Sequence, residues 1–322
     1  MTVSLNPART VSSTPPRVSG LALLQSRGGV FGEKVYVCAR GRRHYVPSVD
    51  RLAGYGLRWP DDLMQVADPV LQAFQIGGWL PPLGVQSLDE APGADSSARM
   101  RELIASSLRG DGLEVGAGAS PFPVPLHCAV RYGDRIPHQQ LVAELYPGQT
   151  EFDLVRPDIL TDFDDFDNVC DASLDFIIGC HVIEHVFDPI GTLVNAHRKL
   201  RPGGRLVLVV PEPSRTFDRA RPLTGLDHLI QDHHDPQSMR DYEHYDEFYR
   251  LAFETPAEQL RAKVDEEFAR RGDLHVHVWT HESFGAMVEH VDRSLCRWSS
   301  VWSHRVIDGA EPGIEFYYLL TK

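Results

Sequence analysis

The chain has 322 residues, and its 42% apolar and 24% charged residues are the proportions of an ordinary globular protein. Its 45 acidic against 32 basic residues give a net charge of −13, which makes nucleic acids and anionic membrane surfaces poor partners. No run approaches the ~18 apolar residues of a membrane span, and the five cysteines lack any C-x₂-C spacing. We therefore expect a cytoplasmic protein with reduced cysteines and no membrane span.

The first quarter of the chain divides into a tail, a small module and a linker. Residues 1–18 are rich in proline, serine and threonine without periodicity, which predicts a flexible tail. Residues 19–84 predict a small α+β module in which the runs 35–38 and 44–46 pair as a hairpin. Residues 85–98 have the composition of a linker. The module is expected to supply an acceptor-binding or homodimer surface, or to pack as a passive cap.

Residues 99–322 have the pattern of an α/β domain. Short apolar runs alternate with helical patterns, which predicts βαβ units and a parallel sheet covered on both faces. Thr280 is expected to cap a helix over residues 282–291. The predicted strands cover residues 113–115, 128–132, 175–179 and 206–210, and the closing runs 295–301 and 313–320 are predicted as the last two.

A glycine turn follows the first of these strands, and its neighbours carry the candidate cofactor residues. In Gly116-Ala117-Gly118, Gly116 permits a backbone conformation that a side chain would forbid, and Gly118 lets a ligand approach the main chain. Glu114 precedes the turn, where a carboxylate suits a cationic ligand and repels a pyrophosphate. Asp134 follows Gly118 by 16 residues and ends the next predicted strand, the usual place of a ribose-binding carboxylate.

Four motifs in this order resemble class I S-adenosyl-L-methionine-dependent methyltransferases. Residues 114–118 (EVGAG) resemble the first motif, and residues 158–163, 173–185 and 200–206 resemble the stretches around the third, fourth and fifth strands. The resemblance implies a Rossmann-like domain with a mostly parallel, seven-stranded sheet, and S-adenosyl-L-methionine as the cofactor. It also implies an adenine contact from Asp162 and the backbone of Phe163. A nicotinamide-dependent oxidoreductase is the rival enzyme, disfavoured by Glu114 and by the absence of a third glycine.

An insertion, residues 214–275, follows the fifth strand and is expected to form a lid. The segments 221–229 (RPLTGLDHL) and 275–280 (HVHVWT) resemble a bacterial subgroup of these methyltransferases that is associated with glycan and polysaccharide biosynthesis. That resemblance implies O-methylation of a sugar or glycan hydroxyl. A non-catalytic glycan-binding or assembly protein on the same fold is the alternative from another class.

Transfer to a hydroxyl requires a base, and histidine is neutral near pH 7. His181, just past the fourth strand, is the predicted base beside the cofactor, whereas His185 stands in a Glu-His pair that is most often structural in this family. The histidine cluster of the insertion has three interpretations that the sequence leaves open: a general base, hydrogen-bonding structure, or a divalent metal bound by Asp232, His233, His234 and His277. We predict the general base, with His277, His233 and His234 as further catalytic candidates and no metal ligand assigned.

Overall fold

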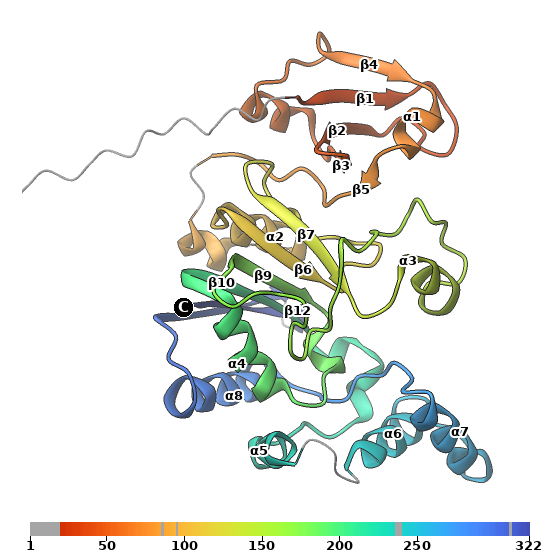
Figure 1. The fold of residues 1–322 in the computed structure, drawn as a ribbon, viewed down its shortest axis with the longest axis vertical. Coiled ribbons are helices and arrows are strands. Elements are labelled where there is room, and N and C mark those ends of the chain that lie inside the picture. Colours follow the sequence, from red (N-terminus) through yellow and green to blue (C-terminus); the bar gives the residue numbers. More distant parts are fainter. Residues whose placement is uncertain (1–19, 85–86, 95, 236–239, 309–310) are drawn as a thin grey trace, which may run out of the picture.

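The computed structural model describes residues 20–84, 87–94, 96–235, 240–308 and 311–322 (Figure 1). The predicted tail, residues 1–18, lies outside the described residues, as do three positions of the predicted linker (85, 86 and 95). Within the described residues, no helix has the length and apolarity that crossing a bilayer requires. Two sheets organise these residues, one in the N-terminal module and one in the domain that follows it.

The N-terminal module is a five-stranded sheet in the order β4-β1-β2-β3-β5. The predicted hairpin is confirmed as β2 and β3, which pair antiparallel across Arg40 and Gly41, both with left-handed backbone (φ 49° and 76°). The sequence pattern did not reveal β1, β4 and β5. The elements are β1 (Ala22–Ser26), β2 (Val35–Ala39), β3 (Arg42–Tyr45), the 3₁₀ helix η1 (Val49–Tyr55), β4 (Leu63–Val66), α1 (Asp68–Gln72) and β5 (Gln75–Ile76).

The larger domain contains the predicted α/β sheet, with seven strands in the order β11-β12-β10-β9-β6-β7-β8. The five neighbouring strands β10, β9, β6, β7 and β8 are parallel to one another. Strand β12 runs antiparallel to both β10 and β11. The Rossmann-like fold class is therefore confirmed. The strands are β6 (Asp111–Val115), β7 (Ala129–Asp134), β8 (Ile159–Leu160), β9 (Leu174–Cys180), β10 (Leu200–Pro211), β11 (Ser300–Asp308) and β12 (Glu311–Thr321).

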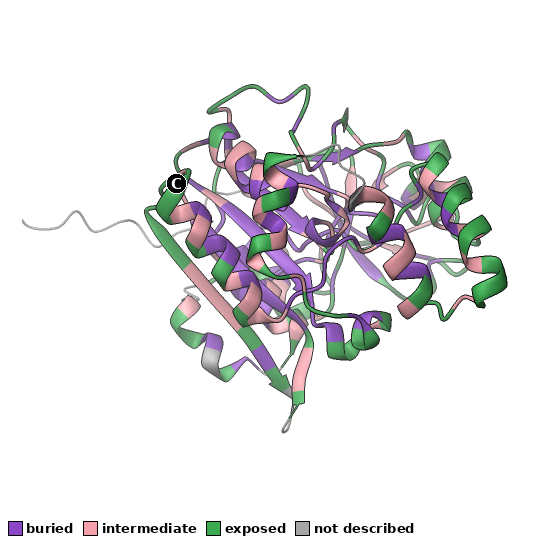
Figure 2. Ribbon diagram, turned by 90° about the horizontal axis from the view of Figure 1, so that it is seen from below, coloured by how far each residue is buried: buried purple, intermediate pink, exposed green. Residues whose placement is uncertain are grey.

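Helices cover both faces of this sheet, which is buried between them (Figure 2). Alternate residues of each strand point to opposite faces, so one apolar layer packs against α4 and α8 and the other packs against α2. The predicted Thr280 cap is confirmed, since its side chain accepts the Ser283 amide at the start of α8. The bounds are α2 (Ser97–Ser106), α4 (Pro189–Lys199) and α8 (His281–Ser294).

Two predicted elements differ in the structure. Residues 295–299 do not extend the penultimate strand, because the Asp292 carboxylate accepts the Trp298 amide (2.7 Å) and turns the chain before β11. No helix joins β6 to β7. The prolines at 121, 123 and 125 remove backbone donors that a helix there would need.

The N-terminal module lies against this irregular connection. Gly78 packs so closely on Phe122 that a Cβ at residue 78 would lie 2.6 Å from the Phe122 carbonyl carbon. Arg40 donates to the Cys128 carbonyl (2.6 Å), and Arg42 pairs with Asp158 (2.6 Å). The module therefore covers part of the domain beside β6 and β7 (Figure 1). Its role as an acceptor or homodimer surface stays a prediction.

The insertion after β10 folds mainly into helices at the end of the molecule opposite the N-terminal module (Figure 1). Helices α6 and α7 pack on each other around Tyr245, Phe248 and Val264, and this small core also takes in Leu274 and Val276. The elements are η5 (Pro213–Arg215), η6 (Phe217–Ala220), α5 (Leu226–His234), α6 (Arg240–Leu251) and α7 (Ala257–Ala269); the remaining short elements are η2 (Leu88–Gly93), α3 (His138–Gln140), η3 (Leu141–Leu145) and η4 (Ile183–His185).

Candidate active site

A cavity of about 470 Å³ opens at the carboxyl ends of β6, β7 and β9. This edge is where open α/β sheets bind ligands, and the volume lies in the range of small-molecule sites. The lining residues are Val115, Gly116, Asp134, Arg135, Leu141, Leu145, Tyr146, Asp162, Phe163, Asp164, His181, Val182, His185, Val186, Phe187, Arg271 and Asp273. We call it the first cavity.

The glycine turn forms part of the wall of the first cavity. Gly116 has a left-handed backbone (φ 71°), and a Cβ there would lie 2.7 Å from a methyl group of Val182. Gly118 is also left-handed (φ 50°), and its space is limited by the Tyr146 hydroxyl. Only Gly116 of the predicted turn lines the cavity, whereas Ala117 packs under it against Tyr132. The turn therefore shapes the cavity through its backbone.

Four carboxylates line the first cavity: Asp134, Asp162, Asp164 and Asp273. Burial raises the pKa of Asp134 to about 6, against the opposing effect of the Ile136 and Arg135 backbone amides. Asp134 stands at the end of β7, as the sequence predicted for a ribose-binding carboxylate. A carboxylate held there can accept hydrogen bonds from ligand hydroxyls, and the acidic wall suits a cationic ligand.

Asp162 and Phe163 both line the first cavity, but in different ways. Asp162 is exposed, and its carboxylate accepts the Phe163 amide at 2.7 Å. The Phe163 ring is 1% exposed, because it packs beneath Gly179 of β9 and against Phe166. Phe163 is thus a core residue at the edge of the cavity.

Glu114 lies beneath the turn and does not line the first cavity. Its side chain is fully buried, and its two oxygens accept the Phe122 amide at 2.8 and 3.1 Å. Burial raises the pKa of Glu114 to about 8, although the Phe122 amide and Arg101 oppose that effect. In this geometry the carboxylate holds the loop after the turn. Its assignment to the cofactor stays a prediction.

His181 lies at the end of β9, faces the first cavity and is anchored from behind. Its Nε2 lies 2.7 Å from a carboxylate oxygen of Glu315 on β12, and its backbone is left-handed (φ 54°). Glu315 also accepts a bidentate pair from Arg101 (3.0 and 2.7 Å) and the Tyr317 hydroxyl (2.6 Å). Burial acts to raise the pKa of Glu315, but these donors overcome it and lower the pKa to about 2. An ionised Glu315 therefore orients His181.

The sequence favours a structural role for His185, but in the structure His185 lines the first cavity and contacts Asp273. Its Nδ1 is 3.2 Å from the carboxylate of Asp273, which also binds Arg135 at 2.9 Å. Burial acts to lower the pKa of His185, but Asp273 and the neighbouring Glu184 raise it above its ordinary value. The pair could not be read from the sequence, because 88 residues separate its members. The Glu-His motif after the fourth strand was the only signal.

A buried network behind His185 contains further acids and bases. The His275 ring packs edge-on against the His185 ring, and its Nδ1 lies 2.6 Å from Asp218. Arg221 is also buried; it binds Asp218 (2.8 Å) and the His275 carbonyl (2.7 Å). The Glu184 carboxylate is fully buried without a hydrogen-bond partner among the described residues, and it lies 3.9 Å from His275 Nε2. Glu184, His185 and His275 are close enough to share a cation.

A second cavity, of about 790 Å³, adjoins this network. It shares His185 and Asp273 with the first cavity, so these two side chains stand at the junction of both. One side is aromatic, and Lys263, Glu267 and Arg270 supply charges. The lining residues are His185, Phe217, Phe248, Tyr249, Phe253, Thr255, Pro256, Gln259, Lys263, Glu267, Arg270, Asp273, Leu274 and His275.

The other three predicted catalytic histidines line neither cavity. His233 lies on α5 with its Nδ1 3.0 Å from Asp188, and His234 is exposed. His277 is 1% exposed, and burial lowers its pKa well below the ordinary value. The metal set suggested by the sequence does not assemble either, because adjacent residues on a helix diverge. Asp232 and His277 instead meet His228 and His244.

The fold is a Rossmann-like α/β domain with a cavity at the carboxyl edge of its sheet, where such folds bind their ligands. The sequence model of a methyltransferase-domain family matches residues 75–291, more than half of the chain. The chain belongs to this family, and the predicted class I S-adenosyl-L-methionine-dependent methyltransferase is confirmed. No curated protein matches the chain significantly.

Several solved structures resemble the chain, although weakly. A methyltransferase from Thermotoga maritima is 15% identical over 68% of this chain and 86% of its own, with a TM-score of 0.34. One from Aquifex aeolicus is 14% identical over 72% and 97%, with a TM-score of 0.36. An arsenic(III) methyltransferase from Chlamydomonas reinhardtii is 17% identical over 66% and 62%, with a TM-score of 0.31. These similarities do not indicate the acceptor.

Proposed function

We propose that this methyltransferase binds S-adenosyl-L-methionine in the first cavity and transfers its methyl group to a hydroxyl of an acceptor in the second cavity. The acceptor class we propose is a sugar or glycan, and His185 is the proposed general base. The observation that carries the proposal is the position of His185 and Asp273, which line both cavities. A base must lie between donor and acceptor. Among the described residues, His185 is the one histidine that lines both cavities.

The first cavity has the chemistry that the methyl donor requires. When bound, S-adenosyl-L-methionine supplies a methyl group on a positively charged sulfur. Asp134 would accept the ribose hydroxyls, and Asp273, whose pKa burial acts to raise but His185 lowers overall, would offset the positive charge. Leu141, Leu145 and the rest of the apolar wall would exclude water from the adenosine.

His185 can take up the acceptor proton because its two ring nitrogens face different partners. His185 Nδ1 lies 3.2 Å from the Asp273 carboxylate, and Nε2 is the nitrogen we propose for the acceptor hydroxyl. S-adenosyl-L-methionine would supply its methyl carbon to the hydroxyl oxygen, and the electron pair of the carbon–sulfur bond would stay on sulfur. The proton moves to Nε2, and the ionised Asp273 stabilises the resulting imidazolium. The products are the methyl ether and S-adenosylhomocysteine.

The aromatic side of the second cavity supports a sugar-like acceptor. Phe217 and Phe253 are exposed, with ring centroids 6.1 Å apart, and present apolar faces on which a pyranose can stack; the buried Phe248 packs against both. Tyr245 in the insertion and Trp279 just after it are 1% exposed and belong to the core instead. Lys263 and Arg270, which both pair with Glu267 (2.7 and 2.6 Å), add charged groups to this cavity that hydroxyls of the acceptor could contact. The glycan acceptor rests on this wall and on the sequence resemblance.

The pH dependence of methyl transfer tests the base. His185 must be neutral to accept a proton, and its pKa is raised above 6.5. The rate should therefore rise with pH through a transition above pH 6.5. In Asp273→Asn the carboxylate that raises this pKa is lost, so the transition should move to lower pH, and the maximum rate should fall about 10–100-fold. Steady-state rates across pH with a glycan panel provide the measurement.

The charged groups facing His185 determine how this result is read. Glu184 and Arg135 remain in the variant; burial and Arg135 lower the His185 pKa, and Glu184 raises it. A transition that stays at the wild-type pH in Asp273→Asn would contradict His185 as the titrating base. Binding of S-adenosylhomocysteine without turnover on any acceptor would favour the non-catalytic glycan-binding alternative.

A further inference from the structure

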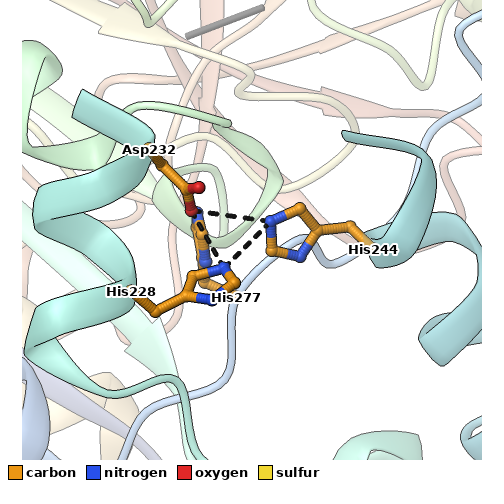
Figure 3. A group of neighbouring side chains, drawn as sticks. All are labelled: His228, Asp232, His244 and His277. Atoms are coloured by element: carbon orange, nitrogen blue, oxygen red, sulfur yellow. Dashed lines mark hydrogen bonds and ion pairs between the residues drawn. The ribbon is translucent and has the colours of Figure 1, made fainter. Parts of the chain in front are cut away.

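We infer that His228, Asp232, His244 and His277 form a closed binding site for one zinc-like divalent cation in the insertion (Figure 3). The four side chains converge in Figure 3, and each offers one ligand atom within 4.8 Å of the others. They come from three separate segments: α5, α6 and the chain before α8. The site lies outside the residues that line the two cavities.

The three distances among His228, Asp232 and His244 fit neighbouring ligands of a tetrahedral cation. His228 Nε2 lies 3.0 Å from an Asp232 oxygen and 3.3 Å from His244 Nε2, and His244 Nε2 lies 3.6 Å from the same Asp232 oxygen. Tetrahedral zinc with ligands at about 2.0–2.1 Å holds neighbouring ligand atoms about 3.3–3.4 Å apart. Imidazole nitrogens and one carboxylate are ligands that zinc accepts.

The burial and the hydrogen bonding of His277 also indicate a metal ligand. Its ring is 1% exposed, and Nδ1 has no hydrogen-bond partner among the described residues. Nε2 lies 3.3 Å from the Phe187 carbonyl, so Nε2–H can donate there and leave Nδ1 with a lone pair. A backbone carbonyl on the distal nitrogen is a common partner of a metal-bound histidine. His244 and Asp232 are also buried, at 7% and 5% exposed.

The arrangement indicates a structural cation. Four protein ligands complete a tetrahedral shell, whereas catalytic zinc keeps a position open. His228 and Asp232 are four residues apart and lie on one face of α5, and His244 and His277 approach from the other two segments. A cation would join α5 and α6 to the chain that carries Asp273 and His275. It would thereby stabilise one side of the second cavity.

The test uses the full chain, freed of metal with a chelator and titrated with Co²⁺ and then Zn²⁺. We expect one Co²⁺ per chain with the intense visible absorption of tetrahedral coordination, displaced by Zn²⁺. Zinc at 100 times its dissociation constant should raise the folding equilibrium constant about 100-fold, seen as a higher Tm. His228→Ala, at a side chain that is 38% exposed, should weaken the affinity more than about 100-fold, because it removes a direct ligand.

His233→Ala is the matched control, because it removes a histidine from the same helix that pairs with Asp188 instead. Its metal affinity should stay within about threefold of the wild type, since adjacent residues of a helix point to different faces. Absence of tetrahedral Co²⁺ absorption in the wild-type chain would overturn the inference, whatever the variants do. Equal affinities of His228→Ala and wild type would also overturn it. These readouts do not depend on methyl transfer.

Discussion

Replacing His185 by glutamine should lower methyl transfer about 10²–10⁴-fold, the usual contribution of a general base. Glutamine keeps a hydrogen-bonding side chain of similar reach but cannot accept a proton at neutral pH. The affinity for S-adenosylhomocysteine should change by less than about threefold, because the substitution removes an interaction made in the transition state. Formation of S-adenosylhomocysteine with a glycan panel and calorimetric binding provide the two readouts.

The control for this variant is His197→Gln, a histidine of α4 whose Nε2 lies near the Arg297 carbonyl, away from both cavities. It should transfer methyl groups at the wild-type rate. The sequence prediction of His181 supplies a competing outcome. If His185→Gln retains full turnover and His181→Gln abolishes it, the base is His181 and our assignment fails.

Replacing Glu315 by glutamine should lower the free energy of unfolding by about 3–5 kcal/mol. The fully buried carboxylate accepts Arg101, His181 and Tyr317 together, so the variant leaves the Arg101 guanidinium without its counterion. Denaturant unfolding at neutral pH measures the loss. Glu289→Gln is the matched control. Glu289 forms an exposed ion pair with Arg293, so this substitution should lower the free energy of unfolding by less than about 1 kcal/mol.

The pH dependence of this loss has a definite sign. The pKa of Glu315 is about 2 in the folded chain and near 4.5 in the unfolded chain. The fold therefore favours the ionised carboxylate. Its contribution is fully present above pH 4.5 and is lost as the pH falls toward 2. The difference in stability between wild type and Glu315→Gln should shrink over that range. A difference that is constant from pH 7 to about pH 3 would contradict an ionised Glu315.

The sequence predicted most of the sheet because local pattern and fold agree there. Apolar runs ending in glycine or aspartate mark β6 and β7. The connection between these strands was harder to predict, since alternation favoured a helix and the three prolines of residues 121–125 decide against it. The short strands β4, β5 and β8 carry too few residues for a periodic signal.

The candidate site was predicted on the donor side better than on the acceptor side. Gly116, Asp134 and Asp162 belong to contiguous motifs, and all three line the first cavity. His185 could be assigned only from its contact with Asp273, which depends on how the insertion folds back. The same holds for the cation site: His228 and Asp232 have helical spacing, but His244 and His277 reach them only through tertiary structure.

The most direct test of the donor site is calorimetric titration of S-adenosylhomocysteine into the intact chain. The two-cavity arrangement predicts saturable binding of one S-adenosylhomocysteine per chain, with Asp134→Asn weakening it about 10–100-fold through the loss of charge-assisted hydrogen bonds to the ribose. No binding to the intact, folded protein would contradict the assignment of the first cavity, and with it the role of His185 between donor and acceptor.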